Sequence, residues 1–243
     1  MESKKRYKPF YKQFLRLRKN IQNRPKLLKF KKKKWIIYQK YLKNQLKFYK
    51  RFKIKDQFQL SISKFASRGN SFQKMFKNNL YDRKTFSLFY GGLKKKYLKK
   101  YILRFINAKP STDVYIDFRH KTLKFFESRL DTVLYRANFS SSIRSASQLI
   151  LHGHVLVNGN PVKTKSYILK ANDSIDIAFS VKSRNLVKNS LDRSNFWPIP
   201  PKHLLVNYKT LQIMFIPVDG LSTMPVFNHY LNIDSVITNI KKY

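Results

Sequence analysis

The stretch "RLDTVLYRANFSSSIRSASQLILHGHVLVNGNPV" (residues 129–162) decides the fold, because it holds two helical patterns followed by the pattern of a tight hairpin. Apolar residues recur at intervals of three, four and seven in its first part, at Leu130, Val133, Leu134 and Ala137. This spacing lies on one face of an α-helix and predicts a short amphipathic helix. Arg129 and Arg136, seven residues apart, fall off that apolar face and share a side.

A second amphipathic helix is predicted to begin after the serine run 140–142. Its apolar face consists of Ile143, Ala146, Leu149 and Ile150. One of the three serines can cap the helix by accepting a hydrogen bond from a free backbone N–H. Arg144, Gln148 and His152 recur every four residues on another face, and Gly153 offers a helix stop.

Two strand patterns follow the helices. "VLVNGNPV" (155–162) alternates apolar and polar residues around Asn158-Gly159, which predicts a tight hairpin. "SYILKANDSIDIAF" (166–179) predicts a strand pair that contains Ile168, Ile175, Ile177 and Phe179, with residues 171–174 as its turn. Residues 128–180 therefore read as two helices followed by a small sheet.

The order of these motifs closely resembles the RNA-binding domain named after the fourth small-subunit ribosomal protein. The matching positions are Arg129, Leu130, Asp131, Tyr135, Arg136, Gln148, Leu149, His152, Gly153, His154, Val157, Asn158, Gly159, Ser166, Tyr167 and Asp173. The family usually has arginines where this chain has Ile143 and Ser147, although Arg144 lies one step away. A shifted Arg144 could replace one of those arginine contacts.

The resemblance extends over nearly the whole chain. "YGGLKKKYLKKY" (90–101) resembles the helix that leads into the family's domain, and residues 200–218 and 233–243 resemble its final strands and terminal segment. Residues 8–35 resemble the amino-terminal region of mitochondrially encoded members. The expected fold is α+β. It has a basic, mainly helical domain (1–127), the RNA-binding domain (128–180), and C-terminal strands with a terminal segment (181–243) that pack on the preceding domains.

Charge separates the chain into two unequal halves. The formal net charge is +40, and residues 1–112 hold 35 of the 52 Lys and Arg residues but three of the 12 acids. Such a charge requires a polyanion or counterions in the compact state. Nucleic acid is the first candidate and an anionic membrane surface is the rival, but no apolar run is long enough to span a membrane.

The basic half also carries helical patterns. Residues 35–49 place Trp35, Tyr38, Leu42 and Tyr49 on one face. Residues 93–105 place Leu93, Tyr97, Tyr101 and Phe105 four apart, with Leu98 and Ile102 alongside. Gly91 and Gly92 before this run predict a turn. Both helices are expected to have an apolar seam and a cationic back.

These patterns define a set of candidate RNA-binding residues. Those in or beside the RNA-binding domain are Arg129, Arg136, Ser141, Ser142, Arg144, Gln148, His152, His154, Asn158, Lys163 and Lys165. Those in the basic half are Lys31, Lys32, Lys33, Lys34, Lys94, Lys95, Lys96, Lys99 and Lys100. Arg129 and Arg136 have an alternative role, which is to pair with Asp131 or other acids. No catalytic or metal site is expected, because the chain lacks cysteine and the two nearby histidines have no third ligand.

The resemblance implies a structural component of the small ribosomal subunit that binds small-subunit rRNA early in assembly, near the mRNA entry side. The implied partners are that rRNA and neighbouring ribosomal proteins, without cofactor, membrane or small-molecule substrate. Composition typical of an A·T-rich gene and the resemblance favour a mitochondrial ribosome over a plastid one. A free-standing RNA-binding assembly or rescue factor is the alternative. An enzyme carrying the same domain is disfavoured, because no Gly-rich phosphate loop precedes it.

Overall fold

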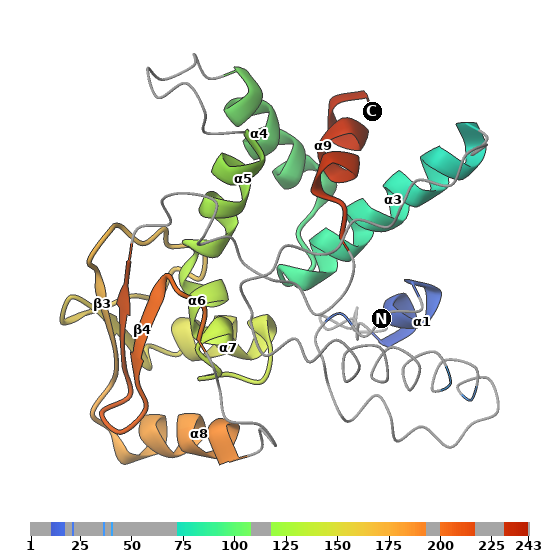
Figure 1. Cartoon of the computed structure of the whole chain (residues 1–243). Helices are drawn as coiled ribbons and strands as arrows, with labels where there is room; N and C mark the ends of the chain where they lie inside the picture. Colours follow the sequence, from blue (N-terminus) through green and yellow to red (C-terminus); the bar gives the residue numbers. More distant parts are fainter. Residues whose placement is uncertain are drawn as a thin grey trace, which may run out of the picture.

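The computed structural model describes residues 11–17, 21, 36, 40, 72–107, 118–192, 200–216 and 231–242, and its architecture is α+β as the sequence predicts. Helices gather on one side of the molecule and a sheet with its covering helices on the other (Figure 1). The elements in chain order are α1 (Tyr11–Leu17), α3 (Phe72–Phe89), α4 (Lys95–Asn107), α5 (Phe118–Glu127), α6 (Leu130–Arg136), α7 (Ile143–Leu151), β1 (Val155–Val157), β2 (Asn160–Pro161), β3 (Ser174–Ile177), α8 (Val181–Asp192), β4 (Leu204–Asn207), β5 (Gln212–Phe215) and α9 (Ile233–Lys242).

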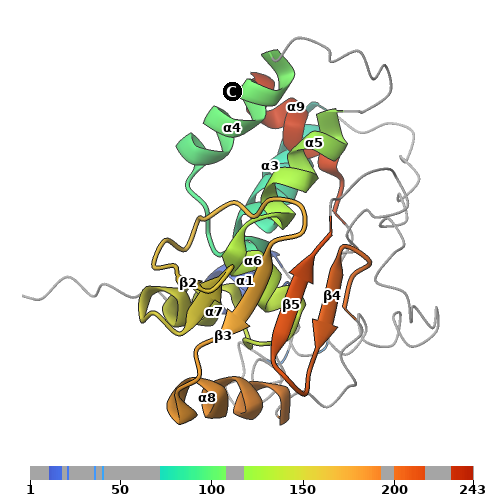
Figure 2. The same cartoon turned by 90° about the vertical axis from the view of Figure 1, so that its left-hand side faces the viewer.

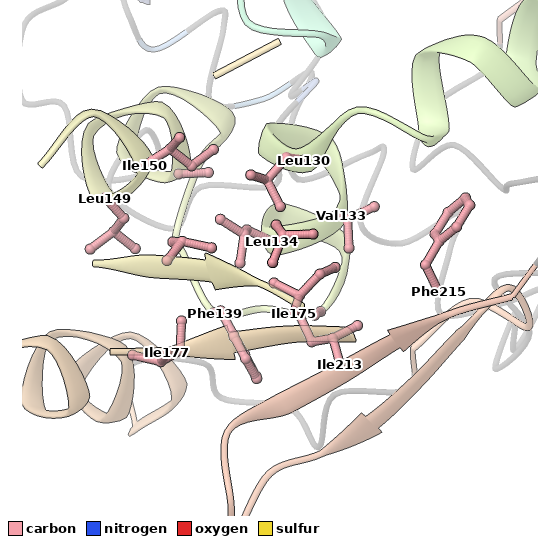
Figure 3. Packing of buried hydrophobic residues seen from close by; sticks show 14 of the residues in the cluster. Leu130, Val133, Leu134, Phe139, Leu149, Ile150, Ile175, Ile177, Ile213 and Phe215 are labelled. Carbon is pink, nitrogen blue, oxygen red and sulfur yellow. The ribbon is translucent and has the colours of Figure 1, made fainter. Parts of the chain in front are cut away.

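The sheet has five antiparallel strands in the order β2-β1-β3-β5-β4. Its two halves come from distant parts of the chain, since β4 and β5 join β3 from beyond residue 200 (Figure 2). Val157, Ile175 and Ile213 lie in one cross-strand row, and all three are almost fully buried. This row faces the apolar sides of α6 and α7, where Leu134 and Leu149 point into the same core (Figure 3).

The local signals for the two helices and the hairpin are confirmed. Ser142 is the N-cap of α7, because its Oγ accepts a hydrogen bond from the Ser145 backbone N–H at 3.2 Å. Gly153 follows the helix with φ +75°. Asn158 and Gly159 both have positive φ, +50° and +81°, as a two-residue type I′ hairpin turn requires.

The predicted pairing of Ile168 with the strand at Ile175 is wrong. Residues 167–169 instead lie along the start of α6, where the Leu130 N–H donates to the Tyr167 carbonyl and the Leu169 N–H to the Ser128 carbonyl. Ile168 forms an isolated antiparallel bridge with Arg129. These hydrogen bonds hold the segment against the start of α6, and β3 pairs with β1 and β5 instead.

The helical side has its own hydrophobic cluster, built from α1, α3, α4, α5 and α9. Within α4 the seam differs from the prediction. Leu98 and Ile102 are fully buried and form its centre, whereas the predicted seam residues Tyr97 and Tyr101 are only half-buried. Tyr101 lies at the margin and stacks on Phe125 of α5, with ring centroids 4.4 Å apart.

The C-terminal helix α9 closes the helical cluster. Val236, Ile237 and Ile240 are buried on its inner face, and Ser235 Oγ donates to Asn79 of α3 at 2.7 Å. Along the chain, most helices of the helical cluster thus precede the sheet, and α9 follows it and packs back on them. The predicted helical face of Trp35, Tyr38, Leu42 and Tyr49 lies outside the described residues, of which this region includes only Ile36 and Lys40.

Candidate nucleic-acid interface

Arg129 is an interior residue, which corrects the expectation that it contacts RNA phosphate. Its side chain is 3% exposed and forms a two-pronged ion pair with Asp131, at 3.0 Å from Nε and 2.7 Å from Nη2. Nη1 donates to the Tyr97 hydroxyl of α4 at 3.0 Å. The alternative role, pairing with Asp131, is the one the structure has.

Arg136 is corrected in the same way. Its Nε and Nη2 donate to the two carboxylate oxygens of Glu127 at 3.0 and 2.8 Å, and the Glu127 side chain is fully buried. The Tyr90 hydroxyl donates to Glu127 Oε1 at 2.7 Å. The guanidinium also lies 4.9 Å from the centroid of the Phe89 ring. Neither arginine can reach phosphate in this conformation.

Glu127 is therefore the centre of a buried polar cluster, which we call the Glu127 cluster and which consists of Tyr90, Glu127, Arg136 and His203. Burial raises the pKa of Glu127, but the Arg136 guanidinium and the hydrogen bonds it receives outweigh that effect, so its pKa lies below the usual value. Burial, and then the Glu127 charge, raise the pKa of Tyr90 well above its usual value. The cluster joins the residue after α3, the end of α5, the end of α6 and the residue before β4.

His203, like Tyr90, is an uncharged member of the Glu127 cluster at neutral pH. It is fully buried, and neither ring nitrogen has a hydrogen-bond partner among the described residues. Burial lowers its pKa to about 4, against a smaller opposing effect of Glu127. At neutral pH the 4.0 Å approach of its Nε2 to Glu127 Oε2 is thus not an ion pair.

We expect His203 to make the fold acid-sensitive. Its pKa is about 4 in the folded protein and about 6.5 when unfolded, so between these values the unfolded state binds the proton and the folded state does not. Stability present above pH 6.5 should fall by about 3 kcal/mol as the pH approaches 4. Urea unfolding across this range should show a smaller loss for His203→Leu. Parallel curves for the two proteins would contradict the assignment.

Three further candidates have side chains that form hydrogen bonds within the protein. Ser142 is buried as the cap of α7, which corrects its assignment to the RNA surface. Asn158 donates to Asp173 at 2.9 Å and accepts from the Ser174 N–H, which holds the hairpin turn against β3. His154 Nδ1 lies 2.8 Å from Ser183 Oγ of α8.

The remaining candidates of the domain lie at its surface. Ser141, Gln148 and His152 are exposed on or beside α7, and Arg144 is half-buried on the same helix. Lys163 and Lys165 are exposed just after the hairpin. Lys163 also lies close to the end of α7, since its Cε is 3.8 Å from the place of a Cβ on Gly153. The outer side of α7 and the residues after the hairpin thus form one polar, cationic surface.

A run of lysines begins just before α4 and continues along it. Lys94, Lys95, Lys96 and Lys100 are exposed and Lys99 is half-buried, in agreement with the predicted cationic back. The turn before α4 lies against the start of α7, because a Cβ on Gly91 would come within 3.1 Å of Ile143 Cγ2. We call the exposed and half-buried cations in or beside α4, in α7 and after the hairpin the cationic surface; they are Lys94, Lys95, Lys96, Lys99, Lys100, Arg144, Lys163 and Lys165. Lys31, Lys32, Lys33 and Lys34 lie outside the described residues.

Sequence reasoning missed Glu127 as the partner of Arg136. Its one signal is local: Glu127 directly follows the apolar residues Phe125 and Phe126 in a chain that has only 12 acids. An acid in such a position is buried only if it is paired. Within the described ranges, no group of three histidines or acids could hold a metal ion, and no helix is long and apolar enough to cross a membrane.

The comparisons with known proteins agree with this architecture. The S4 domain family matches residues 128–175. Small ribosomal subunit protein uS4 of Aquifex aeolicus (strain VF5) is 36% identical over 121 residues, which cover 50% of this chain and 54% of the relative. Small ribosomal subunit protein uS4c of Gossypium hirsutum is 40% identical over 124 residues, covering 51% and 57%. The chain thus spans about half the length of the curated relatives it matches. It contains an S4 domain and is homologous to the uS4 proteins of the small ribosomal subunit.

Proposed function

We propose that the protein is a structural component of the small ribosomal subunit that binds small-subunit rRNA through the cationic surface. One observation carries the proposal: most of the acids that the structure describes are buried inside the fold. Of the seven acids that the structure describes, Asp82, Glu127, Asp131 and Asp173 are buried. The surface lysines therefore face solvent with few acidic neighbours. An RNA backbone supplies the missing negative charge.

Binding of this kind is positional. Lysine and arginine side chains release counterions from phosphates, which contributes affinity without sequence preference. A rigid surface formed by α7, the hairpin and α4 then selects RNA by its shape and its 2′-hydroxyl groups. Ser141, Gln148 and His152 are the polar side chains that would make such contacts. The chain needs no cofactor or small-molecule substrate for this role, and we propose that it is not an enzyme.

The finer parts of the proposal concern place and timing. We propose that the protein binds early in assembly, near the mRNA entry side, with neighbouring small-subunit proteins as further partners. We also propose a mitochondrial ribosome. The bacterial and chloroplast relatives support a ribosomal location for either organelle, so fractionation of mitochondria and plastids is the experiment that separates the two.

The test of the proposed function is sedimentation of native ribosomes. We expect the protein in salt-washed small subunits at one copy per particle, because a structural component remains bound when loosely held factors dissociate. Quantitative mass spectrometry of gradient fractions measures this ratio. Recovery on assembling particles alone, or release by the wash, would instead identify the free-standing assembly or rescue factor.

A further inference from the structure

We propose that Phe179, two residues before α8, and Arg184, in the first turn of α8, form a stacking site for an unpaired RNA base. This inference rests on the proposed function, since it takes RNA as the partner, and it adds a second contact on another helix. Phe179 is 81% exposed, the highest value among the large apolar side chains that the structure describes. An aromatic ring so exposed contributes nothing to the core and is available to a ligand.

The ring is held in place by its neighbours. The Arg184 guanidinium lies over it, with Cζ 5.0 Å from the ring centroid. Ser180, the next residue, accepts a hydrogen bond from the Ser183 N–H at 3.2 Å and thereby caps α8. Ser183 is buried and its Oγ lies 2.8 Å from His154 Nδ1. Phe179 thus projects from an anchored helix start, which lowers the entropic cost of stacking a base on it.

Charge around the ring favours a polyanion. Lys182 and Lys188 are exposed on α8, and Asp192, the last residue, is the one acid within that helix. A base on the open side of the phenyl ring would bring its phosphate within the field of these cations. Phe179 and Arg184 together offer an aromatic face and a guanidinium, two elements that recur in single-strand binding sites.

A protein partner with a groove that receives α8 is less favoured than RNA. The other exposed apolar residues of α8 are Val181 and Leu186, at 74% and 46%. They are five residues apart, and only residues three or four apart are neighbours on a helix surface. They therefore form no continuous apolar stripe, which a helix needs in order to dock into such a groove.

The test compares full-length variants on two RNA probes, a single-stranded oligouridylate and a blunt duplex of equal length. Phe179→Ala should weaken binding to the oligouridylate by about fivefold or more, the lower end of the cost of removing a base-stacking aromatic residue. It should leave duplex binding within about twofold, since every base of the duplex except those of the end pairs is already stacked between its neighbours. Leu186→Ala, also exposed on α8, is the matched control and should change neither affinity.

A fluorescent variant reports the contact directly. Phe179→Trp in a chain carrying Trp35→Phe and Trp197→Phe should retain oligouridylate affinity, and its emission should be quenched on binding. The inference is overturned if Phe179→Ala leaves the oligouridylate affinity unchanged, or if it lowers the affinities for both probes equally. It is also overturned if the substitution weakens only binding to ribosomal proteins. Because stacking is not electrostatic, the slope of affinity against salt should be the same in Phe179→Ala and wild type. A flat salt dependence in both proteins would count against the proposed function itself.

Discussion

The affinity of the full-length protein for small-subunit rRNA is expected to fall by about 10³–10⁵ between roughly 50 and 200 mM salt, the loss that six to ten phosphate contacts cause. The cationic surface supplies that number of positive charges from Lys94, Lys95, Lys96, Lys99, Lys100, Arg144, Lys163 and Lys165. Each contact releases condensed counterions, and added salt reduces the free energy gained from that release. A filter-binding titration over this range measures the slope.

Variants with and without lysines of the cationic surface test whether this surface causes the salt dependence of rRNA affinity. Lys163→Ala with Lys165→Ala should reduce the slope by about 0.7–0.9 for each lysine that contacts a phosphate. Lys209→Ala is the matched control, because Lys209 is exposed in the turn between β4 and β5, at the opposite edge of the sheet. An equal effect of the control, or a nearly flat titration of the wild type, would show that RNA does not bind this surface.

Replacing Glu127 with glutamine is expected to destabilise the fold by about 3–5 kcal/mol. The substitution keeps the size of the side chain but removes the charge that faces the buried Arg136 guanidinium. An unpaired buried charge keeps its desolvation cost and loses the attraction that offset it. Urea unfolding followed by circular dichroism, at constant ionic strength, measures the change in free energy.

Two comparisons separate this effect from a general loss of charge. Asp234→Asn breaks the Arg119–Asp234 ion pair at 3.1 Å, whose side chains are 49% and 54% exposed, and should cost less than about 1 kcal/mol. Glu127→Met combined with Arg136→Met removes both charges and should recover part of the loss, although Tyr90 then lacks its acceptor. A Glu127→Gln protein as stable as Asp234→Asn would contradict a structural role for the Glu127 cluster.

The helices α6 and α7 and the hairpin were predictable because their determinants are local. The apolar face of Ile143, Ala146 and Leu149 fixes the helix that buries it, and the Ser142 cap and Gly153 stop lie within a residue or two of its ends. The Asn158-Gly159 turn is fixed by its own backbone preferences. The candidate residues on the outer side of α7 followed from the same periodicity, since a residue opposite a buried face lies at the surface.

The error over Arg129 and Arg136 has a different physical origin. Periodicity places both residues off the apolar face of α6, and for a charged residue that position usually means solvent. Other elements cover that side of the helix. Tyr97 of α4 contacts Arg129, while Phe89 and Glu127 enclose Arg136. Periodicity along one helix carries no information about which distant segment lies against its polar side.

By itself, the sequence determined the α+β architecture, the two helices and hairpin of the S4 domain, and the large excess of positive charge. The helices and the hairpin depend on residue spacing and turn chemistry, which act over a few residues. The excess of positive charge is a sum over the composition. Only the tertiary structure decided which cations are at the surface and which are neutralised inside. That choice depends on contacts between distant residues, such as Tyr90 with Glu127 and Arg119 with Asp234. A buried charge must find its partner wherever the fold brings one, because the cost of leaving it unpaired exceeds any local preference.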